Sequence, residues 1–207
     1  MPDDLPIYSD SVLRTRLQFA DLERLKGIDT SAVWEKADKH IAQMEGGSNV
    51  REARTAFAAQ DKATLLGIHA TVFRSRDGAG QMRKSDVKPQ FRGQDCPPPQ
   101  FIDRSLENFA SWLTAESFAE IHPIEKAALV LTRIVDIWPF DYGNLTVAVI
   151  FANGMLARAA LPPFFVQAEH LKEFNKIIGQ AMTIETQPLV NAIYATVKRE
   201  METLERR

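Results

Sequence analysis

The segment from Ile137 to Pro163 constrains the fold most, because it predicts a tight turn between two apolar helices. Apolar residues recur at helical spacing up to Ile137. Pro139 must end that helix, because proline lacks a backbone donor and restricts the residue before it. Gly143-Asn144 tolerates the positive φ of a sharp turn, and residues 147–156 form a second apolar helix. A helix that begins at such a turn presents unpaired N–H groups, which predicts an anion-binding site.

The rest of the chain also follows a helical pattern. Ile102, Leu106, Phe109 and Leu113 fall on one helix face, for example. The only change of period is over residues 81–92, which contain Pro89 and fit a short β-hairpin or an irregular flap. Outside this segment we expect helices over 9–25, 33–44, 51–59, 61–73, 99–113, 123–137, 167–182 and 187–207. The pattern therefore predicts an all-α bundle with one small hairpin.

Composition excludes several classes of function. The chain has 207 residues and a net charge of −2, which argues against a dedicated nucleic-acid binder. No apolar run reaches membrane-spanning length, and the start Met-Pro-Asp-Asp is not a signal peptide. Cys96 is the one cysteine and the four histidines are scattered, so we expect no disulfide, no metal site and a cytoplasmic location.

The central turn resembles the signature loop of the Fic (Fic/Doc) domain family, H-P-F-x-[D/E]-G-N-[G/K]-R-x-x-R. Pro139, Phe140, Gly143 and Asn144 match that pattern, and Asp141 stands at its variable position. The run Gly80-Gln81-Met82-Arg83 is similar to the G-x-x-R start of the family's flap. The resemblance implies an all-α, Fic-like helical bundle with a small β-hairpin flap. It further implies a Fic-like domain over 61–207, preceded by a helical extension over 1–60.

The resemblance also implies a chemistry that this chain lacks the residues to perform. Active members transfer AMP from ATP to a protein hydroxyl, with a histidine as base, an acidic residue on Mg²⁺, and glycine and arginine around the phosphates. An indole cannot accept a proton, and threonine or valine cannot form charge-assisted bidentate bonds. We therefore expect an inactive protein that needs no cofactor and acts by protein binding. The positions that differ are Trp138 for the histidine, Tyr142 for the acid, Leu145 for the second glycine, and Thr146 and Val149 for the arginines.

Other interpretations of these residues stay open. The alternative function is an active Fic-type nucleotidyl or phosphoryl transferase with relocated residues, in which Asp141 replaces the acid and Arg83 binds the anion. A third is a structural domain without a peptide site. Trp138 is expected as a buried plug of the old base pocket, the alternative being a pocket for a flat ligand, and His69 is expected as a core residue.

Two further segments suggest regulation and binding. Ser48 to Ala53 weakly resembles the S/T-x-x-x-E-G/N inhibitory helix of self-inhibited family members, with Glu52 as its glutamate. The other interpretation is a helix capped by Ser48 with Glu52 in its first turn. The flap, beginning Gln81-Met82-Arg83, is expected to bind an extended peptide partner along its edge.

Overall fold

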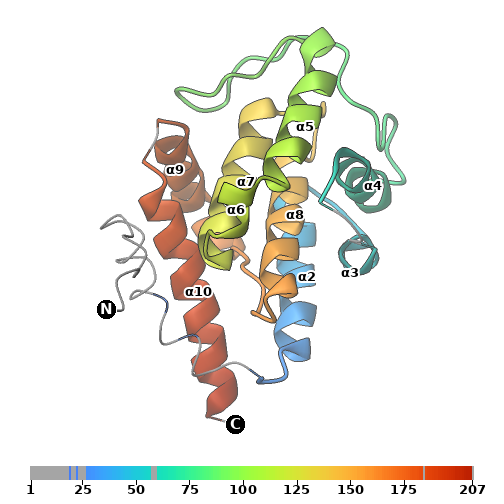
Figure 1. The fold of residues 1–207 in the computed structure, drawn as a ribbon. Coiled ribbons are helices and arrows are strands. Elements are labelled where there is room, and N and C mark those ends of the chain that lie inside the picture. Colours follow the sequence, from blue (N-terminus) through green and yellow to red (C-terminus); the bar gives the residue numbers. More distant parts are fainter. Residues whose placement is uncertain (1–18, 20–21, 23–26, 57–59, 184, 207) are drawn as a thin grey trace, which may run out of the picture.

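Helix α8, Asn144–Arg158, lies at the centre of the fold because it is apolar on nearly every side. All of its residues from Thr146 to Leu156 are buried. Helix α7, Pro123–Ile137, runs beside it, and the two make the most extensive helix–helix contact of the molecule (Figure 1). The turn predicted from Pro139 and Gly143 therefore connects the two central helices.

The computed structural model describes residues 27–56, 60–183 and 185–206 together with Phe19 and Leu22. One group of helices packs on one side of the central pair: α2, Ser31–Met44; α3, Val50–Thr55; and α4, Lys62–Val72. The short 3₁₀ helix η1, Ala168–His170, leads into α9, Leu171–Met182, and with α10, Gln187–Glu205, they lie on the other side. Helices α5, Pro99–Leu113, and α6, Glu116–Ala119, complete the bundle. None of these helices in the described part is long and apolar enough to cross a membrane.

The helical part of the prediction is confirmed. Asp61 caps α4 as expected, because its side chain accepts a hydrogen bond of 2.7 Å from the Thr64 N–H. The helix expected over 9–25 lies outside the described residues except for Phe19 and Leu22, which are helical and buried. The helix expected over 51–59 is shorter than predicted within the described part, and the one expected over 167–182 divides into η1 and α9. Helix α6 was not predicted.

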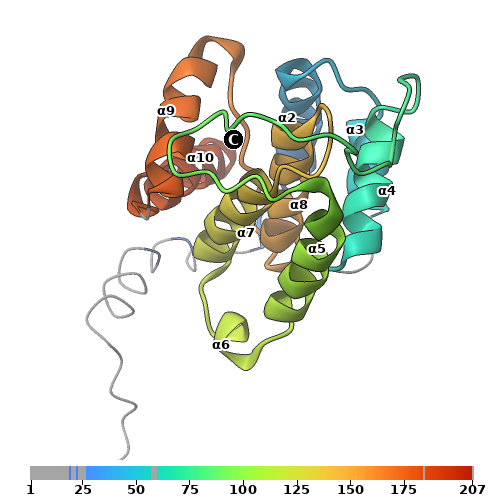
Figure 2. The same ribbon diagram turned by 90° about the horizontal axis from the view of Figure 1, so that it is seen from above.

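The β-hairpin flap predicted from Gln81 onward is wrong, because the described residues between α4 and α5 form no strand. The segment instead crosses the end of α7 towards α9 and returns to α5 (Figure 2). Arg83 explains this path. Its N–H donates to the Pro139 carbonyl at 2.9 Å. Its buried guanidinium donates to the carbonyls of Trp138 at 2.8 Å, Ser85 at 2.9 Å and Pro97 at 2.5 Å.

Gln94 is a second residue that holds this segment, because its side chain binds main-chain N–H groups that a hairpin would pair between its strands. The buried amide of Gln94 donates to the Val135 carbonyl at 2.6 Å and accepts from the N–H groups of Gln90 and Phe91 at 2.7 and 3.2 Å. The Cys96 N–H donates to the Asp136 carbonyl at 3.0 Å. The flap is therefore paired with the end of α7 and with its own side chains rather than across a hairpin.

We predict that Arg83→Met lowers the free energy of unfolding by about 3 kcal/mol, because buried carbonyls lose a charged donor. Urea melts measure this loss, and hydrogen exchange should lose protection at the Arg83 and Cys96 amides. Arg92→Met is the matched control, since Arg92 is exposed in the same segment. Equal effects of the two substitutions would contradict the role given to Arg83.

Candidate functional site

The backbone of the central turn depends on two left-handed residues. Trp138 ends α7 with φ 48° and ψ 61°. Gly143 precedes α8 with φ 74°, and a Cβ built there would lie 2.2 Å from the Phe73 ring. A side chain at position 143 would thus be strained and would clash, so glycine is required by both conformation and space.

Asn144 closes this turn with its side chain. Its Oδ1 accepts from the Phe140 N–H at 2.9 Å, and its Nδ2 donates to the Phe140 carbonyl at 2.8 Å. Both residues are fully buried. Asn144 therefore holds the start of α8, and its side-chain amide is directed at the main chain of Phe140.

His69 of α4 supports the turn from behind. Its Nδ1 accepts from the Gly80 N–H at 2.8 Å, and its Nε2 therefore carries the proton that bonds to the Tyr142 carbonyl at 3.1 Å. The ring stacks on Phe140 with centroids 3.9 Å apart. Burial lowers the pKa of His69 to about 4. The imidazole is thus a neutral link between α4, the flap and the turn, with no nitrogen free to act as a base.

The expected plug at Trp138 is only partly formed. The indole is partly buried rather than fully buried, and it packs edge-on against Phe91 with centroids 6.3 Å apart. Tyr142 is also partly buried, and its hydroxyl donates to the Asp77 carbonyl at 2.7 Å. Asp141 points to solvent. Of the other loop positions, Pro139, Phe140, Thr146 and Val149 are buried and Leu145 is partly buried.

The N-terminus of α8 is occupied by a carboxylate of this chain. Glu45, at the end of α2, accepts a hydrogen bond of 2.7 Å from the Thr146 N–H. Burial raises the pKa of Glu45, although the N–H groups of Thr146 and Leu145 act in the opposite direction. The predicted anion site is therefore present, and an internal anion fills it.

Glu52, which was expected at the inhibitory position, does not contact the start of α8. It is exposed and forms an ion pair with Arg74. The Ser48 hydroxyl donates to the Val72 carbonyl at 3.1 Å. Glu45-Gly46 also matches the last two positions of the pattern S/T-x-x-x-E-G/N, with Ile41 at the first.

Arg76 is the arginine beside the turn that could bind a phosphate, and it was not predicted from the sequence. Its guanidinium lies over the Tyr142 ring at 3.8 Å and donates to the Glu45 carbonyl at 3.4 Å. The guanidinium of Arg83 already donates to the Trp138 carbonyl, and that of Arg133 forms an ion pair of 2.7 Å with Asp136. No sequence pattern identified Arg76, since it follows the end of α4 rather than the signature loop.

We predict that Glu45→Ala lowers the free energy of unfolding by about 1–3 kcal/mol, because it leaves a buried N–H unpaired.

Glu45→Gln keeps an oxygen acceptor and removes the buried charge. The raised pKa means that the folded state holds the proton more tightly than the unfolded state. The contribution of Glu45 to stability is therefore greatest below the ordinary value of 4.5 and falls as pH rises through the raised value.

Urea melts across this pH range should show a larger fall in the native protein than in Glu45→Gln, in which Glu125, whose pKa burial also raises, still contributes. The exposed Glu52→Gln is the control, and it should behave like the native protein. An equal pH dependence in the native protein and in Glu45→Gln would contradict the assignment.

The region that contains the central turn also matches known proteins. The family model of the Fic/DOC family matches residues 59–156. A protein adenylyltransferase Fic of Culex quinquefasciatus is 29% identical over 141 residues, covering 67% of this chain and 28% of that protein. Protein adenylyltransferase fic-1 of Caenorhabditis elegans is 28% identical over 132 residues, covering 62% of this chain and 25% of that protein. The matched region is thus less than a third of the length of these relatives.

Solved structures agree in fold. A Fic domain-containing signaling protein from Bacteroides thetaiotaomicron superposes with a TM-score of 0.70 at 14% identity, covering 91% of this chain and 95% of that one. A fragment of Fic-1 from C. elegans gives 0.64 at 19% identity, covering 96% and 66%. An IbpAFic2 variant in complex with adenylylated Cdc42 gives 0.62 at 16% identity, covering 90% and 70%. Residues 59–156 therefore match the Fic/DOC family, and the chain shares the fold of the solved Fic domains.

Proposed function

We propose that this chain is a Fic-fold protein that does not transfer AMP and that acts by binding another protein. The observation that carries the proposal is the Glu45 carboxylate on the Thr146 N–H at the start of α8. A phosphate bound at this helix terminus would have to displace a buried anion that is already hydrogen-bonded there.

The residues at the turn do not fit Mg²⁺ and ATP. Leu145 places a branched side chain where glycine lets phosphate approach the backbone. Tyr142 is a poor ligand for Mg²⁺, which prefers hard oxygen ligands, and its hydroxyl is already committed to Asp77. Glu45 would repel a phosphate at short range.

The turn also lacks a candidate base. Trp138 carries only a donor N–H. Both nitrogens of His69 are used, one by Gly80 and one by Tyr142. The lowered pKa of His69, about 4, keeps it neutral at pH 7, yet it has no free lone pair to receive a proton from a substrate hydroxyl.

The alternative is a Fic-type nucleotidyl or phosphoryl transferase with relocated residues. Arg76 favours it, because its guanidinium stacks on Tyr142 beside the turn and is otherwise exposed. Asp141, also exposed, is the nearest carboxylate in sequence to the acidic position. Such an enzyme would still need Glu45 to leave the start of α8.

The flap supplies the proposed binding surface. Among the described residues, the N–H groups of residues 84–88 have no hydrogen-bond partner, and Lys84, Ser85, Asp86 and Lys88 are exposed. Unpaired main chain in an extended segment is the feature that added peptide strands use. A protein of similar fold, an IbpAFic2 variant, has been solved in complex with adenylylated Cdc42. We infer that an extended segment of a protein partner docks along residues 81–87.

The proposed organisation keeps residues 61–207 as the Fic-like domain and residues 1–60 as a helical extension. In this arrangement α2 of the extension delivers Glu45 to the turn, and α2 and α3 both pack against α8. The extension then occupies the start of α8 through Glu45 rather than through Glu52. A cytoplasmic location stays a prediction from the sequence.

We predict that the protein binds Mg-ATP no tighter than about millimolar, only some 4 kcal/mol. Calorimetry with Mg-ATP, and labelling with radioactive ATP, test this on the native protein and on Glu45→Gly. Both should be silent, because removal of the carboxylate restores neither an arginine nor a base. Micromolar affinity in the native protein would promote the transferase alternative. Binding that appears only in Glu45→Gly would mean a locked enzyme rather than an inactive one.

We predict that Ser85→Pro abolishes capture of the partner, because it removes one unpaired main-chain donor from the flap and leaves the charges in place. Ser85→Ala keeps that donor and should capture the partner as the native protein does. Pull-downs from the native host with all three proteins make the comparison, and melting temperatures check folding. Undiminished capture by a folded Ser85→Pro protein would contradict binding at the flap.

A further inference from the structure

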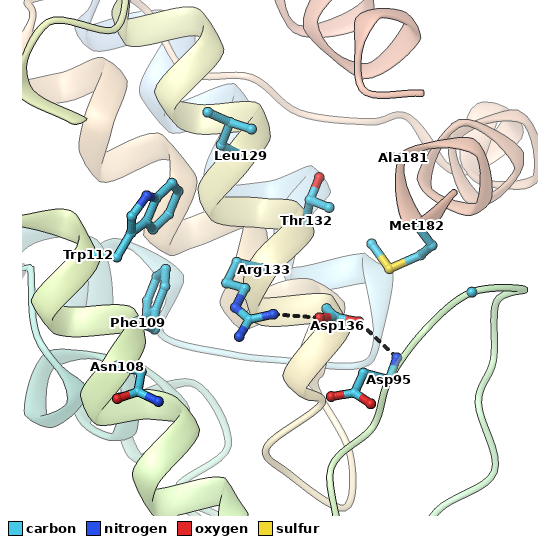
Figure 3. A pocket seen from close by; sticks show the side chains of 11 residues that line it. Asp95, Asn108, Phe109, Trp112, Leu129, Thr132, Arg133, Asp136, Ala181 and Met182 are labelled. Carbon is cyan, nitrogen blue, oxygen red and sulfur yellow. Dashed lines mark hydrogen bonds and ion pairs between the residues drawn. The ribbon is translucent and has the colours of Figure 1, made fainter. Parts of the chain in front are cut away.

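A groove of about 650 Å³ lies on the face of α7 that is not packed on α8 (Figure 3). Its walls come from α5, α7, the last turn of α9 and residues 93–95 at the base of the flap. None of these residues belongs to the turn or to the contact of Glu45 with α8. The volume is in the range of pockets that hold small molecules.

One wall of the groove is apolar and rigid. Phe109 and Trp112 project from α5 and Leu129 from α7, whereas Met182 of α9 lies across the groove, on the side of Thr132 and Asp136 (Figure 3). The Trp112 ring packs on Phe118 with centroids 4.6 Å apart and on Phe109 at 6.2 Å. It is only partly buried, so one region of a fixed indole remains open to a ligand.

The opposite wall is polar and equally fixed. Asp136 accepts from the Asp95 N–H at 2.8 Å through one carboxylate oxygen and from Arg133 at 2.7 Å through the other. The Asp136 carbonyl accepts from the Cys96 N–H at 3.0 Å. These bonds hold the main chain at Asp95 in place before any ligand arrives, which reduces the entropy cost of binding.

The charges on this wall do not cancel. Arg133 and Asp136 form an ion pair, so together they contribute no net charge. Asp95 is exposed, and its carboxylate has no hydrogen bond or ion pair with any other residue of the described part. The groove therefore combines an open indole surface with one uncompensated negative charge.

We propose that this groove binds a small organic cation, an ammonium or amidinium group attached to a flat apolar body. The body packs against Phe109, Trp112 and Met182, and the cation is held by Asp95. An anion is disfavoured, because Asp136 already neutralises Arg133.

Three indole compounds of similar size separate the effect of charge from that of apolar contact. They are tryptamine, which is a cation, tryptophol, which is neutral, and indole-3-propionate, which is an anion. Calorimetry at low salt should give tryptamine at least tenfold tighter binding than tryptophol, and indole-3-propionate should bind most weakly. Asp95→Asn should reduce tryptamine to the affinity of tryptophol.

The matched control is Glu169→Gln, which removes an exposed carboxylate in η1 before the other end of α9. It should leave tryptamine affinity unchanged. Equal binding of tryptamine and tryptophol would overturn the role of charge. Preferred binding of indole-3-propionate, or no binding of any compound at millimolar concentration, would overturn the proposal itself. Tryptamine binding that Asp95→Asn leaves intact would place the cation elsewhere and would also overturn it.

Discussion

The hydrogen bond from the Thr146 N–H to the Glu45 carboxylate is the interaction on which the rest of the structure depends. Helix α8 begins in the interior of the molecule, where water cannot satisfy its first N–H groups. Glu45 supplies a negative charge at the end of the helix where such a charge is favoured. The same bond ties α2 to the central helix, which is 101 residues away in the sequence. Burial of the Glu45 carboxylate is unfavourable, and it therefore raises the pKa of this group.

The other groups around the turn are satisfied in the same internal way. Asn144 bonds both main-chain groups of Phe140, and His69 bonds Gly80 and Tyr142. Arg83 gives its guanidinium to main-chain carbonyls of the turn and the flap. The principal donors of the turn and the N–H of Thr146 at the start of α8 are thus bonded to groups of this chain. This internal bonding is the basis of the proposal that the turn does not bind a nucleotide.

Local features made the helices and the turn predictable. Pro139 ends one helix, Gly143 has no room for a side chain, and both effects act over a few residues of sequence. The flap was mispredicted because the decisive group, the Arg83 guanidinium, bonds to Trp138 and Pro97 across 55 and 14 residues. Local propensity cannot reveal such partners.

Long-range contacts also explain what was missed at the candidate site. Glu52 was preferred to Glu45 because its segment begins with the serine of the pattern, Ser48, whereas Glu45 matches only the last two positions. The packed structure places Glu45 at the start of α8. Arg76 had no motif to mark it. The groove is built from four separate segments, so Asp95, Trp112 and Met182 carry no common signal in the sequence.

The most direct test of this account is a ¹³C NMR titration of the Glu45 side-chain carboxyl, with the Thr146 amide followed in the same samples. If the buried Glu45 carboxylate binds the Thr146 N–H, Glu45 titrates above the ordinary value of 4.5 and the Thr146 amide proton shifts with the same midpoint. Titration of Glu45 at the ordinary value, with a Thr146 amide that does not follow it, would contradict the claim that this carboxylate occupies the start of α8.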